Sequence, residues 1–187
     1  MQSLQEHIAQ GMGIAFYAKN IPQNKAVISE FGERTFEELN GKRNCYANFL
    51  LDKGLKPGDS VAIICKNRPE FLEALFGSLR IGLRITPINW HLTPEEISYI
   101  VENCEAQVVV CDAIFSDFFK ELQKNLPDAI LMSVDGENHY SIPFSSTINS
   151  YDNSDISEPV AGRSMLYTSG TTGRPKGVFR KENPPPS

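Results

Sequence analysis

Hydrophobic and polar residues alternate in two distinct patterns over the first 135 positions of the chain. Short, nearly continuous apolar runs occur at residues 60–65, 83–88, 107–111 and 130–134, and such runs are typical of strands covered on both faces of a sheet. Between these runs, apolar residues recur every three to four positions, which predicts helices. The regular alternation predicts an α/β fold with a mostly parallel sheet and helices on both of its faces.

Local signals predict where two of the helices begin and end. Two stretches have the spacing of a capping box, in which a Ser or Thr and a Glu three residues later cap each other's backbone N–H groups. They are Thr35 with Glu38 and Thr93 with Glu96. We expect one helix to run from the first box to Gly54, because glycine readily ends a helix, and the other to end near Cys104.

Other elements are predicted from weaker patterns. Residues 26–36 read as a hairpin that turns at residues 32–33. Asn67 is a candidate cap for a further helix, with Pro69 in its first turn. Residues 114–125 read as one long helix.

These elements divide the chain into consecutive parts. We expect an α/β core at residues 26–135 and then a polar segment, residues 136–162, that has no clear period and reads as a loop or crossover. Residues 163–178 read as a strand followed by a glycine-rich loop. Residues 179–187 form a proline-rich tail, which favours polyproline II.

The glycine-rich loop has the composition of an anion-binding site. Glycines allow backbone N–H groups to converge on one point, hydroxyl groups add donors, and Arg174 and Lys176 add positive charge. We therefore predict that it binds the phosphates of a nucleotide triphosphate. The candidate ligand-binding residues are Thr168, Ser169, Gly170, Thr171, Thr172, Gly173 and Lys176.

This loop differs from the Walker A phosphate loop, which has four residues between its glycines and a Ser or Thr after the lysine. Here two residues separate Gly170 from Gly173, and Gly177 follows the lysine. The alternative without a ligand is a Gly/Thr-rich hairpin tip or linker. Four hydroxyl groups followed by a Pro-Lys-Gly ending favour the phosphate-binding interpretation over a plain turn.

Composition excludes several classes of partner. The chain has 18 Lys and Arg against 23 Asp and Glu, a net charge of -5, and no basic stripe, which argues against nucleic acid or an anionic membrane as the main partner.

The four cysteines lack Cys-x-x-Cys spacing and the three histidines are scattered, so no metal-ligating residues are predicted. The sequence shows no secretory signal and no apolar run near the ~18 residues of a transmembrane segment. A cytoplasmic location is expected.

The run at residues 166–178 resembles the signature of the adenylate-forming (AMP-binding) superfamily, which includes the acyl-CoA synthetases. Four earlier segments are similar to the amino-terminal part of acyl-CoA synthetases and occur in the same order; they are residues 32–39, 54–62, 67–71 and 87–96. The resemblance covers most of residues 28–178. It implies that residues 1–187 are a truncated amino-terminal domain of the adenylate-forming enzyme fold.

The resemblance also implies a reaction. A carboxylic acid, with a fatty acid as the expected case, attacks the α-phosphate of ATP, pyrophosphate leaves, and coenzyme A then displaces AMP from the acyl-adenylate. Mg2+ would accompany the triphosphate. In this scheme the loop from Thr168 to Lys176 holds the departing phosphates, and Lys176 does not correspond to the family's catalytic lysine. No catalytic residue is therefore expected within this chain, which by itself should be inactive.

Several alternatives stay open at the level of the sequence. The chain could instead be a non-catalytic nucleotide-binding or interaction domain that keeps the fold. The acyl substrate, and the choice between coenzyme A and a carrier protein as the thiol acceptor, cannot be read from these residues. Because the last strand is expected to pack against further chain in the family fold, we also expect one of two outcomes for the chain alone: a homo-oligomer or other self-association, or poor order from Gly136 onward.

Overall fold

The computed structural model describes residues 3–136, 138–168 and 175–179. Its main element is a seven-stranded sheet. In chain order the strands are β3 (Ser60–Ile64), β4 (Arg84–Pro87), β5 (Ala106–Asp112), β6 (Ile130–Val134), β7 (Ile142–Pro143), β8 (Arg163–Thr168) and β9 (Lys176–Phe179).

The strand order is β7-β6-β5-β3-β4-β8-β9. Every neighbouring pair is parallel except β8 and β9, which are antiparallel. The predicted mostly parallel sheet is confirmed. Because parallel strands share a direction, the carboxyl ends of β3, β4, β5, β6 and β8 lie along one edge of the sheet.

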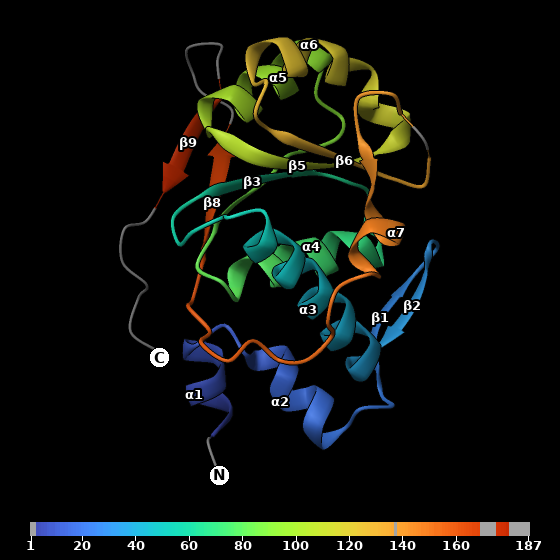
Figure 1. Cartoon of the computed structure of the whole chain (residues 1–187), viewed down its shortest axis with the longest axis vertical. Helices are drawn as coiled ribbons and strands as arrows, with labels where there is room; N and C mark the ends of the chain where they lie inside the picture. Colours follow the sequence, from blue (N-terminus) through green and yellow to red (C-terminus); the bar gives the residue numbers. More distant parts are fainter. Residues whose placement is uncertain (1–2, 137, 169–174, 180–187) are drawn as a thin grey trace.

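Helices cover both faces of this sheet, as predicted (Figure 1). Helices α3, α4 and α7 pack on one face, whereas α5, η1 and α6 pack on the other. The helices are α1 (Leu4–Ala9), α2 (Gly13–Asn20), α3 (Phe36–Asp52), α4 (Pro69–Leu79), α5 (Pro94–Asn103), the 3-10 helix η1 (Ala113–Phe118), α6 (Phe119–Asn125) and α7 (Phe144–Ile148).

The central strand β3 shows why these runs are apolar throughout. Val61 and Ile63 pack into the core beneath α3 and α4, whereas Ala62 and Ile64 pack into the core beneath α5 and α6. All five residues of β3 are buried. Successive side chains of a strand point to opposite faces, so a strand between two helical layers has no solvent-facing position for polar residues.

Both predicted capping boxes are confirmed. Thr35 Oγ1 accepts the Glu38 backbone N–H at 3.2 Å, and a Glu38 side-chain oxygen accepts the Thr35 N–H at 2.7 Å. The same reciprocal pair at Thr93 and Glu96 begins α5. Gly54 follows α3 with a φ of 82°, a left-handed conformation that glycine adopts without strain.

The predicted hairpin is present, but its turn lies two residues earlier than expected. Strands β1 (Lys25–Ser29) and β2 (Gly32–Thr35) pair antiparallel, with Ser29 opposite Gly32. The turn therefore comprises residues 30–31, and the prediction of a turn at residues 32–33 is wrong. The Ser29 hydroxyl fixes the turn, because it accepts the Phe31 N–H at 3.2 Å and donates to the Gly32 carbonyl at 2.9 Å.

Two helix predictions also need correction. The residue that caps α4 is Arg68 rather than Asn67, and its side chain makes no capping bond because a guanidinium group has no acceptor for a backbone N–H. The predicted single helix at residues 114–125 is divided into η1 and α6. Ser116 explains the division, since its hydroxyl bonds the Ala113 carbonyl at 2.6 Å and its own carbonyl accepts the Asn138 side chain, which competes with α-helical bonding.

The segment 136–162, predicted as a loop or crossover, is partly structured. It adds β7 to the sheet edge and forms the short helix α7, whose Phe144 and Ile148 are fully buried. Phe144 packs against Tyr46 of α3, with ring centroids 5.2 Å apart. Five helical residues are too few for a visible period, so these two isolated apolar residues gave no recognisable helix signal.

After α7 the segment runs past the helical layer to β8 (Figure 1). Its last part lies against the end of α4, where the Gly162 N–H donates to the Leu79 carbonyl at 2.6 Å. A side chain at Gly162 would approach the Leu83 carbonyl oxygen to 2.4 Å, so only glycine fits this close contact. The crossover therefore delivers β8 to its place beside β4.

Candidate nucleotide-binding site

The candidate phosphate-binding loop joins β8 to β9. The predicted strand at residues 164–167 is confirmed as part of β8, and the antiparallel register places Thr168 opposite Lys176. Both residues are exposed. The structure thus brings together the two ends of the predicted loop, a hydroxyl group and an ammonium group, at the mouth of one hairpin. The predicted residues Ser169, Gly170, Thr171, Thr172 and Gly173 lie outside the described residues.

The mouth of this hairpin lies at the carboxyl edge of the parallel sheet, because Thr168 is the last residue of β8. In open α/β sheets, ligands bind outside the carboxyl ends of the strands. A hydroxyl donor and a mobile cation at this edge suit an anionic ligand such as a phosphate chain. The described ends of the loop fit the predicted ligand chemistry.

Tyr167 anchors the hairpin to helix α5. Its hydroxyl donates to Asn103 Oδ1 at 2.6 Å, and burial, with smaller contributions from Cys104 and Tyr99, raises the pKa of Tyr167 to about 12. The phenol therefore remains protonated at neutral pH and keeps its donor. Since Tyr167 directly precedes Thr168, this bond fixes the strand from which the candidate loop begins.

Gly177 lets β9 lie close to β8 directly after Lys176. A Cβ atom at this position would come within 2.3 Å of Met165 Cε and 3.1 Å of Tyr167 Cζ. Both side chains pack on the core that α5 and α6 cover. A larger residue would displace them, so the glycine after the lysine has a packing role in addition to any role in the loop.

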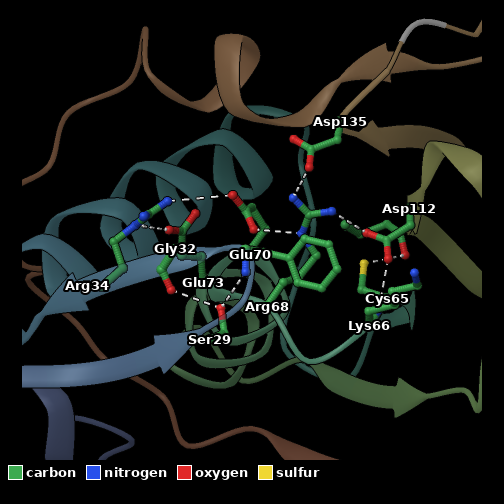
Figure 2. A network of polar contacts seen from close by, with 12 residues as sticks. Ser29, Gly32, Arg34, Cys65, Lys66, Arg68, Glu70, Glu73, Asp112 and Asp135 are labelled. Carbon is green, nitrogen blue, oxygen red and sulfur yellow. Dashed lines mark hydrogen bonds and ion pairs between the residues drawn. The ribbon is translucent and has the colours of Figure 1, made fainter.

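A second polar feature of the carboxyl edge is a network of ion pairs centred on Arg68 (Figure 2). Arg68 is only 4% exposed and follows β3. Its Nε donates to Glu70 at 2.8 Å, its Nη1 donates to Asp112 at 2.9 Å, and its Nη2 pairs with Asp135. The partners Asp112 and Asp135 come from the end of β5 and from the residue after β6.

The network extends outward to the β1–β2 hairpin through Arg34, as Figure 2 shows. Arg34 Nε donates to Glu73 at 2.8 Å, and its Nη2 lies 3.6 Å from Glu70. Burial acts to lower the pKa of Arg68, but its carboxylate partners outweigh this effect and raise it. All three guanidinium nitrogens of Arg68 already have carboxylate partners. The network therefore holds β3, β5, β6 and the hairpin together.

Sequence patterns did not identify the Arg68 network. Arg68 stood next to a predicted helix cap, and the carboxylates Asp112 and Asp135 follow strands that are not adjacent in the sequence. One usable signal was present, because charged residues lie at or just after the ends of three buried strands: Lys66 two residues after β3, Asp112 at the end of β5 and Asp135 directly after β6. Carboxyl ends of parallel strands meet at one edge, so such residues are expected to be neighbours.

Aromatic residues complete this edge beside the network. Trp90, which follows β4, stacks on Phe115 with ring centroids 5.3 Å apart. The Lys66 ammonium lies 5.6 Å from the centroids of both Trp90 and Phe31. Among the residues that the structure describes, no group of three or more His, Cys, Asp or Glu side chains is arranged to hold a metal ion. Within the same residues, no helix has the length and apolar character needed to cross a membrane.

A sequence-family comparison identifies the chain. The family model described as "AMP-binding enzyme" matches residues 15–183. This chain belongs to the AMP-binding enzyme family. The family resemblance predicted from the loop and the earlier segments is confirmed.

Curated relatives of this AMP-binding chain are ligases by name. It is 33% identical over 166 residues to the fatty acid–[acyl-carrier-protein] ligase ScoC of Streptomyces coeruleorubidus, a match that covers 88% of this chain and 31% of the relative. It is 31% identical over 171 residues to a medium/long-chain-fatty-acid–CoA/3-oxocholest-4-en-26-oate–CoA ligase of Mycolicibacterium smegmatis, covering 85% of this chain and 30% of the relative. The chain thus spans less than a third of the length of these relatives.

Solved structures of the family share the fold. The anthranilate CoA ligase AuaEII, crystallised with anthranoyl-AMP, aligns with a TM-score of 0.78 at 25% identity and covers 88% of this chain and 33% of its own. The apo structure of MbtA from Mycobacterium smegmatis aligns with a TM-score of 0.78 at 26% identity. The alignment covers 91% of this chain and 33% of the MbtA chain. The AMP-binding chain therefore has the mixed α/β fold of the amino-terminal domain of adenylate-forming enzymes.

Proposed function

We propose that this chain is the amino-terminal part of an ATP-dependent acyl-CoA synthetase, an acid–thiol ligase. The intact enzyme would activate a carboxylic acid, with a fatty acid as the expected substrate, and transfer the acyl group to coenzyme A. The observation that carries the proposal is the β8–β9 hairpin, which places Thr168 and Lys176 together at the carboxyl edge of the sheet. The ligase names of the relatives support the reaction class.

In the first step, a carboxylate oxygen of the substrate attacks the α-phosphorus of ATP, and the bond from that phosphorus to the bridging oxygen of pyrophosphate breaks. Negative charge develops on the departing pyrophosphate. We assign its binding to the residues of the hairpin loop, whose hydroxyl and N–H groups donate to it while Lys176 neutralises its charge. The residues to which we assign pyrophosphate binding are Thr168, Ser169, Gly170, Thr171, Thr172, Gly173 and Lys176.

Mg2+ accompanies the triphosphate in this proposal and neutralises further charge, with phosphate oxygens and water as its usual ligands. In the second step, a thiol attacks the acyl carbon and AMP leaves. We propose coenzyme A as the thiol. The name of ScoC, a ligase of fatty acids to acyl-carrier protein, supports a carrier protein as the alternative acceptor.

The proposal assigns a place to each part of the chain. Residues 1–187 are a truncated amino-terminal domain, residues 26–135 its α/β core, residues 136–162 the crossover, residues 163–178 the strand and phosphate loop, and residues 179–187 a proline-rich tail. The chain carries no catalytic residue of its own in this assignment. We propose a cytoplasmic location, because all four cysteines are free and buried, as in a reducing compartment.

Exchange of labelled pyrophosphate into ATP tests this function in the intact protein that carries this chain. We expect exchange that depends on an added carboxylic acid, measured across acids of different chain length. A second candidate function is a nucleotide-binding or interaction domain that keeps the fold without the chemistry. Binding of Mg-ATP without exchange for any acid would favour this second function.

A further inference from the structure

A buried cluster of positive charge lies at the carboxyl end of α4, whereas the Arg68 network lies at its amino end. Arg43 of α3 and Arg80, the residue after α4, are both 0% exposed. Their neighbours are Met12, Asn40 and Asp155, which come from the N-terminal helices, α3 and the crossover. We call these five residues the arginine pocket.

The hydrogen bonds of the arginine pocket leave several donors unused. Arg43 Nε and Nη2 both donate to Asn40 Oδ1, at 3.0 and 2.7 Å. Arg80 Nη2 lies 2.7 Å from Met12 Sδ and 3.4 Å from Asp155 Oδ1. Arg43 Nη1, Arg80 Nε and Arg80 Nη1 are buried without a hydrogen-bond partner among the described residues. Such buried unpaired donors are rare in folded proteins and commonly mark a bound water or ion.

The balance of charge distinguishes an ion from a water molecule. Two guanidinium groups share one carboxylate, that of Asp155, which is half exposed. Its Oδ1 already accepts the side-chain amides of Asn40 and Asn44 at 3.1 and 3.0 Å. A water molecule would complete the hydrogen bonds but would leave the excess positive charge uncompensated in a low-dielectric environment.

The Arg68 network provides an internal comparison. There, one buried guanidinium has three carboxylate partners. In the arginine pocket, burial, together with the like charge of Arg80, lowers the pKa of Arg43 to about 9, and Asp155 opposes this only in part. Arg43 still remains mostly protonated at neutral pH. The charge of Arg68 is thus balanced by three carboxylates, whereas Arg43 and Arg80 have one carboxylate between them.

We propose that the arginine pocket binds a small monovalent anion of the halide class, held by Arg43 Nη1 and by Arg80 Nε and Nη1. A cavity of about 380 Å³ lies beside the pocket, between α1 and the crossover. Met12 lines this cavity, and its sulfur also contacts Arg80 Nη2, so one flexible side chain belongs both to the wall of the cavity and to the arginine pocket.

A bound anion would stabilise the contact between the crossover and the ends of helices α3 and α4. Asp155 begins the stretch of the crossover that approaches β8, and the Val160 N–H donates to the Arg80 carbonyl at 3.0 Å. The anion would therefore stabilise the part of the chain that delivers β8 to the sheet. This inference is independent of the proposed ligase activity.

Thermal unfolding of the full chain tests the proposal when chloride replaces gluconate at constant ionic strength. We expect Tm to rise with chloride by about 3–5 °C for each tenfold increase above the dissociation constant, as a single site requires. Arg80→Met should abolish the dependence. Arg34→Met, which removes a paired arginine from the other network, is the matched control and should retain it.

Broadening of the 35Cl resonance by the protein measures binding directly and does not depend on how well the Arg80 variant folds. Asp155→Asn should tighten chloride binding, because it removes the only carboxylate of the pocket with little change in shape. The proposal would be overturned if wild-type protein caused no chloride-specific broadening of the 35Cl resonance. Weaker chloride binding by Asp155→Asn than by wild type would also contradict it. Equal chloride dependence of Tm in wild type and Arg80→Met would do the same.

Discussion

Thr168 and Lys176 are the described residues on which the proposed chemistry depends, and each owes its position to a neighbour. Thr168 follows Tyr167, which is bonded to Asn103 of α5. Lys176 precedes Gly177, whose missing side chain lets β9 lie against Met165 and Tyr167. The exposed polar residues of the loop mouth are thus held by partly buried residues beside them.

Lys176→Ala should weaken binding of Mg-ATP to the chain about tenfold or more, because a hydrogen bond from a charged group contributes about 1.5–3 kcal/mol. Isothermal titration calorimetry measures the change. Lys120→Ala, which removes an exposed lysine of α6, is the matched control and should bind Mg-ATP like wild type. Equal affinity of the Lys176 variant and wild type would remove this lysine from the phosphate site.

Glu73 should make the stability of the chain depend on pH. Burial raises the pKa of Glu73 above its ordinary value of 4.5, although Arg34 opposes this. The folded state then binds a proton more tightly than the unfolded state, so the contribution of Glu73 to stability falls as pH rises from 4.5 to the raised value. In urea unfolding, wild type should lose stability relative to Glu73→Gln across this range. A relative gain with rising pH would contradict the assignment.

At the scale of elements, the crossover is held by two buried side chains of a short helix and by one close backbone contact. Its helix α7 has five residues, too short to be stable alone, and it persists because Phe144 and Ile148 enter the core beneath α3. The same segment closes on α4 through Gly162. Two short contacts therefore fix a long connection that looks irregular in the sequence.

Phe144→Ala should destabilise the chain by about 3–5 kcal/mol, the usual cost of removing a buried aromatic side chain. Urea unfolding of the variant gives the change in free energy. Ser145→Ala, at the exposed neighbouring position, is the control and should change stability by less than about 0.5 kcal/mol. A loss below 1 kcal/mol for Phe144→Ala would mean that α7 does not anchor the crossover.

At the scale of the whole molecule, the β8–β9 end of the sheet leaves an apolar surface exposed. Leu166 and Val178 lie opposite each other in the two strands and are 54% and 51% exposed. The opposite side of the same hairpin is covered, because Met165 and Tyr167 pack against the core. Exposed apolar pairs on an edge hairpin favour association with another surface.

We therefore expect the 187-residue chain to self-associate, and the double substitution Leu166→Ser with Val178→Ser should reduce association at micromolar concentration. Sedimentation velocity reports the size distribution. Ile114→Ser removes another exposed apolar side chain, 66% exposed in η1, and should leave association unchanged. Monomeric wild-type chain at high concentration would contradict this expectation.

We expect the chain alone to form no acyl-CoA from fatty acids, ATP, Mg2+ and coenzyme A, because the proposed function assigns phosphate binding to it and no catalytic group. Positioning of reactants contributes up to roughly 7–11 kcal/mol of the barrier reduction in enzymes. Mass spectrometry of the reaction mixture is the measurement, because it would detect acyl-CoA even at low yield. Turnover by the purified chain would show that the catalytic groups lie within these 187 residues.

The sequence by itself determined the features that depend on local order. Buried strands such as β3 are apolar because both faces are covered, and capping boxes such as Thr35 with Glu38 act within four residues, so a pattern is sufficient to locate them. The candidate phosphate loop could be predicted for the same reason, since its glycines, hydroxyl groups and lysine lie within one short run of the sequence. Fold class and family followed from these local patterns.

Only the tertiary structure decided which distant residues meet. Arg68 reaches Asp112 and Asp135 because β3, β5 and β6 are neighbours in the sheet, an order that no local pattern specifies. The arginine pocket likewise links Arg43 to Arg80 through Asn40 and Asp155, which lie far apart in the sequence. Burial of such charges depends on contacts between segments far apart in the chain, and their electrostatic energy is set by distances and solvent exposure that the order of residues does not contain.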